Sequence, residues 1–249
     1  MLRKLLKLIG FVVLVAFLVI TLAFSANESR NIPCRSIEIE ISENELIKIS
    51  KDEIARLVNS ADDKLIGKNL EQINADFIEN EVEKHQAIYK AEVYKVIAKD
   101  TVNYRGILGV RVKHREPAVR IMSAGGRYYL DKNGEKIPVS SNYTANVLVA
   151  TGYFSEKFAK EQLLPFVLFL ENNPFWEAQI EQVHVEQDGD IMLTPLIGDH
   201  LIELGRLENY QAKLRNMKAF YQQVMARNKW NEYKMVSLKY DNQVIAKKR

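Results

Sequence analysis

The chain has 249 residues, of which 47% are apolar and 27% are charged, an ordinary composition for a folded protein and unlike that of a disordered one. Its formal charge of +3 comes entirely from Arg3, Lys4 and Lys7. The rest of the chain is formally neutral, which excludes the basic field typical of nucleic-acid-binding proteins. The single cysteine, Cys34, excludes an internal disulfide and a cysteine-rich metal site and is expected to be a packed or linker thiol.

An uncharged apolar segment follows the N-terminal cations, over residues 8–26. At about 1.5 Å per residue, a helix of this length crosses a hydrocarbon core of roughly 30 Å. The preceding cations predict a cytoplasmic N-terminus, with the bulk of the chain outside the cytoplasm. A cleaved signal peptide is the alternative, but its apolar region is usually only about 7–15 residues long. We therefore predict a cytoplasmic tail over residues 1–7, a single transmembrane helix over 8–26 and a linker over 27–35.

Residues 36–117 carry the pattern of a compact α+β unit. Alternating Ile37, Ile39 and Ile41 predict a half-buried strand, and Ser50 with Glu53 forms a capping box for the helix that follows. A second helical pattern and two strand patterns come next, over residues 73–85, 87–98 and 106–117. The predicted order is strand, helix, helix, strand, strand.

The segment YYLDKNGEKIPV, residues 128–139, presents two alternatives. Asp131, Asn133 and Glu135 supply oxygen atoms of the kind that bind a cation. A helix–loop–helix calcium site needs its glycine at the sixth loop position, however, whereas Gly134 is the fourth residue from Asp131, and the flanks are strand-like. Asn133-Gly134 supplies the positive φ angles of a tight turn, so we predict a β-hairpin.

The rest of the chain is predicted to mix helices and strands. In chain order we expect a helix over 155–172, strands around 178–187 and 190–204, a helix over 207–224 and a last strand over 233–248. Pro165 is expected to kink or divide the first of these helices. Asp188-Gly189 is a hairpin signal between the two middle strands. The fold class is therefore α+β, with a β-rich second domain that has flanking helices.

The sequence gives little sign of chemistry. The four histidines have no metal-site spacing; they are His85, His114, His184 and His200. Neither a G-x-S-x-G motif nor a Gly-rich phosphate loop is present. Asp188, Asp190 and Asp199 provide the carboxylates of a hydrolase in principle, but the first two flank a turn glycine and are expected to be solvated. We expect no catalytic residue, no cofactor and no metal.

The predicted last strand is the candidate binding element. Leu238, Tyr240, Asn242 and Val244 share one face of it, and no later segment follows the terminal cations to pair with it. An open strand edge recruits strands from other chains by backbone pairing. The alternative is that this strand pairs internally on both sides and that its basic tail prevents aggregation. The residues alone leave both readings open.

These features together resemble the FtsQ/DivIB family of bacterial cell-division proteins. The resemblance begins with the short basic tail and single anchor, and AEVYK (91–95) and REPAVRI (115–121) are similar to the family's POTRA domain. Segments similar to the family's β domain follow at 128–152, 174–185 and 237–248. One departure is YKVIAKDTVNYRGILGV (94–110), in which the link between two POTRA strands is longer than in the family.

The resemblance implies a POTRA domain over 36–121 and an FtsQ-type β domain over 122–249, on a single-pass protein of the plasma (inner) membrane at the division septum. It implies a non-catalytic divisome scaffold that binds FtsB- and FtsL-like bitopic proteins and helps recruit and regulate the septal peptidoglycan synthase. The family takes up an FtsB strand at the last strands of the β domain. Carried over to this sequence, the partner-binding residues are Leu238, Tyr240, Asn242, Gln243 and Val244. The alternatives are another POTRA-bearing envelope transport or chaperone component, or an anchored cell-wall hydrolase.

Overall fold

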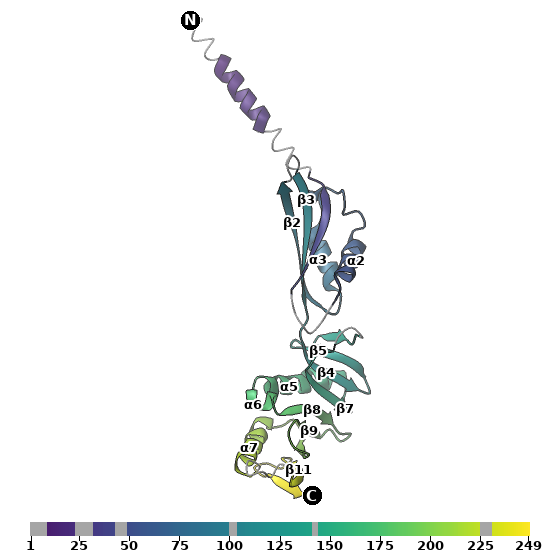
Figure 1. Ribbon diagram of the computed structural model, residues 1–249, viewed down its shortest axis with the longest axis vertical. Helices are drawn as coiled ribbons and strands as arrows, with labels where there is room; N and C mark the ends of the chain where they lie inside the picture. Colours follow the sequence, from purple (N-terminus) through teal and green to yellow (C-terminus); the bar gives the residue numbers. More distant parts are fainter. Residues whose placement is uncertain (1–8, 23–31, 43–48, 100–103, 141–143, 225–230) are drawn as a thin grey trace. The chain divides into compact units, whose positions relative to one another are not determined.

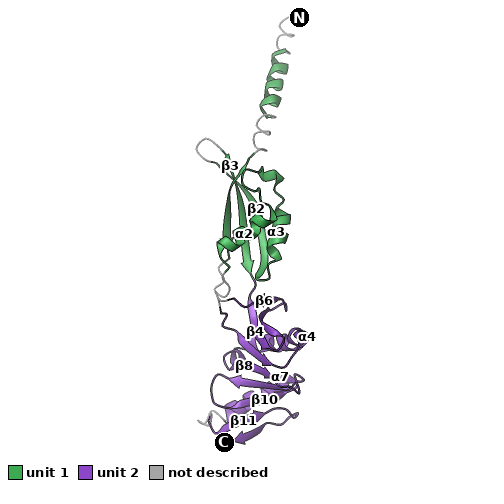
Figure 2. Ribbon diagram, turned by 90° about the vertical axis from the view of Figure 1, so that its right-hand side faces the viewer, with its two compact units in different colours: residues 1–43, 49–114 green, residues 44–48, 115–249 purple. Residues whose placement is uncertain are grey.

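The chain divides into two compact units after His114 (Figures 1 and 2). The computed structural model describes residues 9–22, 32–42, 49–99, 104–140, 144–224 and 231–249. Both units mix helices and strands, as the sequence predicts. The predicted boundary lies after Ile121, but strand β4 (Pro117–Ser123) pairs with strands of the second unit. The REPAVRI segment therefore lies in the second unit.

A helix over residues 9–22 precedes the first unit, and every residue in it is exposed. Within the described parts of the chain, no helix is both long enough and apolar enough to cross a membrane. The predicted span over 8–26 extends beyond this helix at both ends. Residues 8 and 23–26, like the predicted tail over 1–7, lie outside the described residues.

The first unit packs two helices against one face of a three-stranded sheet (Figure 1). Its elements, in chain order, are β1 (Cys34–Ile41), α2 (Lys51–Ala61), the 3₁₀ turn η1 (Leu70–Gln72), α3 (Ala75–Glu83), β2 (Ile88–Lys99) and β3 (Tyr104–His114). The sheet order is β1-β3-β2, with β1 parallel and β2 antiparallel to β3. This confirms the predicted order of strand, helix, helix, strand, strand.

Local chemistry sets the start of α2. The Ser50 hydroxyl accepts a hydrogen bond from the Glu53 amide at 3.2 Å, which satisfies one of the free amides at the helix N-terminus. Ile54 and Val58 are then one turn apart and fully buried against the sheet. Cys34 is also fully buried, so its thiol is packed, as predicted.

His114 is buried at the end of β3. Side chains alternate along a strand, so His114 faces the same side as the fully buried Val110 and Val112. Neither of its ring nitrogens has a hydrogen-bond partner among the residues that the structure describes. Burial, with a smaller contribution from the charge of nearby His85, lowers the pKa of His114 below its ordinary value. His114 is therefore neutral in the folded protein.

The variant His114→Leu is expected to stabilise the first unit and to weaken its sensitivity to acid. A histidine whose folded pKa is depressed contributes stability that is present above its unfolded pKa of about 6.5 and is lost as the pH falls toward the folded pKa. Leucine removes the unpaired nitrogens, which should gain roughly 1 kcal/mol at neutral pH.

Hydrogen exchange of β2 and β3 amides in the full chain, at pH 7.5 and 5.0 and corrected for intrinsic rates, measures this effect. The variant should lose less protection at pH 5.0 than the parent. An equal loss in both proteins would show that another group controls the acid response.

The second unit contains one large mixed sheet. Its strands after β4 are β5 (Gly126–Asp131), β6 (Lys136–Pro138), β7 (Leu148–Gly152), β8 (Ile180–Val185), β9 (Ile191–Pro195), β10 (Leu201–Gly205), β11 (Tyr233–Ser237) and β12 (Ile245–Lys248). The nine described strands lie in the order β12-β11-β10-β9-β8-β7-β4-β5-β6. Parallel neighbours such as β7 and β8, or β10 and β11, are joined by helical crossovers.

The crossover helices cover one face of this sheet (Figure 1). They are α4 (Glu156–Phe158), the π-helical turn η2 (Ala159–Leu163), α5 (Leu164–Glu171), α6 (Pro174–Glu177) and α7 (Tyr210–Gln223). Pro165 lies in the first turn of α5, directly after η2. The backbone stays in the right-handed helical region through Leu163 and Leu164, so the helix is not divided there and a π-helical turn precedes the proline instead. Strands β8 and β9 alternate between buried residues on the helix side and half-buried residues on the other face.

The hairpin predicted at residues 128–139 is confirmed, since β5 pairs antiparallel with β6. The Gly134 amide donates to the Asp131 carbonyl at 3.0 Å, and Gly134 has a φ of +80°, whereas Asn133 does not need a positive φ. The Asp131 carboxylate accepts the Asn133 and Glu135 amides and pairs with Arg115 at 2.9 Å. The acidic side chain therefore stabilises the turn itself.

Two segments that were each predicted to be one strand form two strands in the structure. The stretch 190–204 forms two strands, β9 and β10, and the stretch 233–248 forms two strands, β11 and β12. Between β9 and β10 the chain turns back through Gly198, which has a φ of +92°. Between β11 and β12 the apolar–polar alternation runs up to Tyr240 and resumes with the same period at Val244.

Candidate interaction site

The C-terminal end of the second unit leaves a strand edge open. β12 pairs antiparallel with β11, with Val236 opposite Ala246 and Ser237 opposite Ile245. Within the described chain, β12 pairs with no other strand. Its outer edge therefore presents backbone donors and acceptors that a strand from another chain can pair with.

Alternate residues of β12 direct their amides toward this edge. The amide of Arg249, which directly follows β12, donates to the Glu232 carbonyl at 3.1 Å and so points toward β11. Because amide directions alternate along an antiparallel strand, the Lys247 amide also points toward β11. The amides of Ala246 and Lys248 therefore point outward and are the backbone contact positions for an added strand.

The residues predicted to bind a partner lie between β11 and β12 rather than within a strand. Leu238 is buried in the core, and Val244 is half-buried against it. Tyr240, by contrast, is 58% exposed, and Asn242 and Gln243 are exposed in the turn. Leu238 and Val244 thus hold the segment to the unit, and the other three side chains are open to contact.

Asn242 is the residue that turns the chain back. Its φ is +57°, in the left-handed region that asparagine tolerates better than most residues, and the Gln243 amide donates to the Tyr240 carbonyl at 3.3 Å. The pair Asp241-Asn242 is the sequence signal for this turn. The alternation of apolar residues on either side obscured it.

Four of the five predicted residues line one pocket of about 190 Å³. Its walls are Leu238, Tyr240, Asn242 and Gln243 with Asp241 on one side, and Asn209, Ala212, Lys213 and Asn216 of the α7 region on the other. The Lys213 ammonium is buried and donates to the carbonyls of Leu204 and Arg206, each at 3.0 Å. It ties the first turn of α7 to the end of β10, so the wall of the pocket is fixed.

Asp190 anchors the start of the same segment. It was expected to be a solvated turn residue, but it is buried and accepts a hydrogen bond from the Lys239 ammonium at 2.5 Å. That hydrogen bond raises the pKa of Lys239, and the Arg206 guanidinium lies 3.7 Å from the other carboxylate oxygen. Carboxylates that lose their exposure are usually paired in this way. The chain leaving β11 is therefore held against the start of β9.

The open edge carries positive charge at its C-terminal end. The Lys248 ammonium lies 3.6 Å from the Glu232 carboxylate, and the Arg249 guanidinium lies 3.2 Å from that of Asp199. Lys247 forms no ion pair with any residue that the structure describes. A strand added here would meet at least one uncompensated cation.

The uncovered face of the sheet holds the nearest approach to a catalytic arrangement. The Thr151 hydroxyl lies 2.7 Å from Nδ1 of His184 and accepts a hydrogen bond from the Gln182 amide at 3.0 Å. The Glu186 carboxylate is 3.9 Å from Nε2 of His184, which is beyond hydrogen-bond distance. Thr151 lies directly opposite His184 in the register of β7 and β8, and Gln182 lies two residues before His184 on β8. This arrangement is therefore cross-strand pairing of polar side chains.

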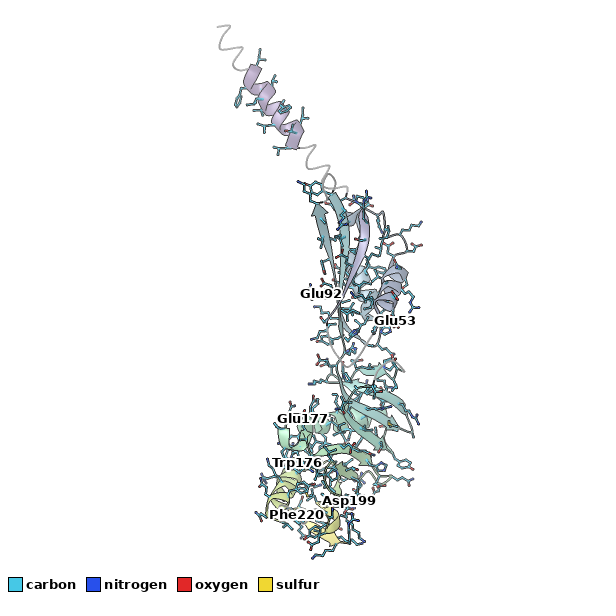
Figure 3. All side chains as sticks on the ribbon, in the orientation of Figure 1. Glu53, Glu92, Trp176, Glu177, Asp199 and Phe220 are labelled. Carbon is cyan, nitrogen blue, oxygen red and sulfur yellow. The ribbon has the colours of Figure 1, made fainter. Side chains whose placement is uncertain are left out.

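A larger pocket of about 440 Å³ lies beside α5 and α6. The buried Trp176 and the neighbouring Glu177, both labelled in Figure 3, line it together with Glu171 and Glu181. Its lining includes no serine, cysteine or histidine. Among the described residues, no group of three histidine, cysteine or acidic side chains is placed to hold a metal ion.

The two units and their order define a POTRA-domain protein with a C-terminal β domain, since a model of POTRA-like domains matches residues 30–102. The sequence model described as "FtsQ/DivIB, C-terminal related" matches residues 116–247, which is more than half of the chain. The chain belongs to this family. The resemblance noted in the sequence is thereby confirmed.

Two curated relatives are each similar to more than half of the chain. The cell division protein FtsQ of Rhodothermus marinus is 28% identical over 156 residues, which cover 57% of this chain and 56% of the relative. That of Salinibacter ruber is 28% identical over 158 residues, which cover 58% of this chain and 61% of the relative. The matched part therefore spans little more than half of each relative.

Proposed function

We propose that this protein is a non-catalytic scaffold of the bacterial division machinery that binds FtsB- and FtsL-like bitopic proteins. Membership of the FtsQ/DivIB family and the names of the two relatives support the division role. Binding these partners would collect the septal peptidoglycan synthase at the division site and regulate it. The scaffold would act by equilibrium binding, so no reacting group is required of it.

The observation that carries this proposal is the open edge of β12. Its outward amides at Ala246 and Lys248 would pair with the backbone of an FtsB-like strand, which would become the next strand of the sheet. Backbone pairing supplies affinity with little sequence preference. Selectivity would come from side chains that surround the edge, here the polar pocket beside α7 and the cation of Lys247.

Within this site, Tyr240, Asn242 and Gln243 would contact the partner, and Leu238 and Val244 would hold their segment in place. Tyrosine is a frequent anchor of protein interfaces because it buries a large rigid surface and keeps a polar end. Tyr240 is the largest exposed side chain of the segment.

We also propose a single-pass topology. The tail over 1–7 would lie in the cytoplasm, residues 8–26 would span the inner membrane, and a linker would lead to the two domains outside the cytoplasm. A helix that exposes apolar side chains on all sides, as residues 9–22 do, is stabilised by lipid rather than by water. The protein would be concentrated at the division septum.

The variant Tyr240→Ala is expected to weaken binding of an FtsB-like partner about tenfold or more. Truncating a central aromatic anchor usually costs at least about 1.4 kcal/mol of binding free energy, which corresponds to a factor of ten. The measurement is a titration of the full chain in detergent with the extracytoplasmic part of the host's FtsB-like protein.

Tyr153→Ala is the matched control, because Tyr153 is also a highly exposed tyrosine of the second unit, at the end of β7. The control should bind like the parent. Unchanged affinity in the Tyr240 variant would remove Tyr240 from the interface, and an equal loss in both variants would point to a general effect on the unit.

A further inference from the structure

The β2–β3 hairpin of the first unit extends beyond the rest of its sheet. β1 pairs with β3 only from Gly106 onward, where Cys34 lies opposite it. The pair Ala98–Arg105 and the pair Lys99–Tyr104 lie beyond the start of β1. We call residues 95–99 and 104–105 the hairpin end.

The hairpin end exposes apolar side chains on both of its faces. Opposite residues of an antiparallel pair share a face, so Ile97 lies opposite Gly106, which has no side chain to cover it. Ile97 and Tyr104 are each 54% exposed, and Val96, which points to the other face, is exposed as well. A hairpin that extends into water usually leaves apolar side chains on at most one face.

Cations flank these apolar side chains. Lys95, Lys99 and Arg105 form no ion pair within the described chain, and residues 95–105 contain one acid, Asp100. Tyrosine together with lysine, arginine and aliphatic side chains is typical of protein segments at the membrane–water interface. Cations near an anionic lipid surface are attracted to it electrostatically.

The path of the chain brings this end of the unit toward the proposed membrane span. Residues 27–33 are the only ones between the end of the span at Ala26 and the start of β1 at Cys34. A seven-residue link reaches at most about 25 Å when fully extended. Since Cys34 pairs with Gly106, the chain enters the first unit at the hairpin end and not at the opposite end.

We propose that the hairpin end inserts Val96, Ile97 and Tyr104 into the interface of an anionic membrane, as a second attachment of the first unit to lipid. A lipid interface surrounds a hairpin on all sides, which suits apolar residues on both faces, whereas a protein partner would cover one face. This inference rests on the membrane anchor of the proposed function. The inference goes beyond the proposed function by assigning a lipid contact to the folded first unit.

The test uses the full chain reconstituted into phosphatidylglycerol–phosphatidylcholine vesicles with brominated acyl chains, which quench tryptophan on contact. Tyr104→Trp places the reporter at the hairpin end. Tyr89→Trp is the matched control, since Tyr89 is 48% exposed and lies on β2, the strand that also carries Ile97. Eight residues separate Tyr89 from Ile97, a distance of about 26 Å along β2.

The parent already contains Trp176 and Trp230, so the signal of residue 104 is the fluorescence of Tyr104→Trp minus that of the parent. This difference is expected to be at least halved in brominated vesicles compared with unbrominated ones. That of Tyr89→Trp is expected to stay within a tenth of its value in unbrominated vesicles. Adding Ile97→Ser to Tyr104→Trp should restore much of the lost signal. These vesicles contain no other protein, so quenching at residue 104 identifies lipid as the occupant.

Flotation of the vesicles separates the two levels of the proposal. If the protein floats with the vesicles but Tyr104→Trp is not quenched, the lipid contact is overturned and the anchor stands. If the protein fails to float, the anchor is overturned and the lipid contact with it. Equal quenching at residues 104 and 89 would mean that the whole unit lies flat on lipid, which also overturns a contact specific to the hairpin end.

Discussion

Cells in which this protein is replaced by its Ala246→Pro variant are expected to grow as filaments with separated chromosomes and no finished septa. Proline has no amide hydrogen, and its ring occupies the position from which the Ala246 amide points outward. The variant loses one intermolecular hydrogen bond. The proline ring also keeps the incoming strand at a distance on both sides of position 246. The internal pairing of β12 with β11 is retained, because it uses the amides of Ile245 and Lys247.

The measurement is microscopy of the native host during depletion of the wild-type protein, with the variant expressed at an equal level. Ala246→Val is the matched control, since valine changes the same side chain but keeps the amide, and it should restore division. Normal division with Ala246→Pro would contradict strand addition at β12. Normal division after depletion, without any replacement, would contradict the division role itself and favour a protein of envelope transport or wall maintenance.

Features that depend on residues close together in the sequence were predictable. The Ser50 cap, the alternation of Ile37, Ile39 and Ile41, and the turn at Gly134 are each determined by side chains within a few residues of one another. The hydrogen bonds of the cap and the turn join residues three positions apart, whereas the strand obtains its hydrogen bonds from β3. The corresponding elements lie within a few residues of where the sequence predicts them.

The position of strand reversals was harder to predict than the presence of strands. In the stretch 233–248 the alternation through Val236, Leu238 and Tyr240 resumes in phase at Val244, so the turn between them does not shift the pattern. Asp188-Gly189 marks its turn clearly, because Gly189 adopts a φ of +86°. The turn at Asn242 uses a residue that also occurs in ordinary loops, so the stretch 233–248 was interpreted as one strand.

The candidate site could be located on the chain but not built from the sequence. Family resemblance directs attention to residues 238–244, and four of the five predicted residues do line one pocket. The opposite wall comes from the start of α7, and the anchor of Lys239 comes from Asp190. Contacts over such separations follow from chain topology. The open edge also follows from chain topology, because the crossover through α7 places β11 beside β10 and leaves β12 as the outermost strand.

Gly152→Ala is expected to destabilise the second unit by about 4 kcal/mol or more. Gly152 ends β7 with a φ of +109°, which other residues adopt only with strain of about 1–3 kcal/mol. An added Cβ would also overlap the backbone carbonyl oxygen of Val185, its partner in register on β8. That carbonyl accepts the Tyr153 amide at 2.9 Å, so moving it away breaks a backbone hydrogen bond at the centre of the sheet.

Urea unfolding of the full chain, followed by tryptophan fluorescence, measures this effect, because the buried Trp176 reports on the second unit. Gly125→Ala is the matched control in the same unit: Gly125 has no positive φ, and the nearest atom to an added Cβ is 3.5 Å away. The control should change stability by less than about 0.5 kcal/mol. Hydrogen exchange in β2 and β3 should be unchanged in Gly152→Ala if the first unit folds by itself. A parallel loss of protection in β2 and β3 would instead show that the two units unfold as one. A urea midpoint equal to that of the parent would show that β7 and β8 separate easily enough to admit the methyl group.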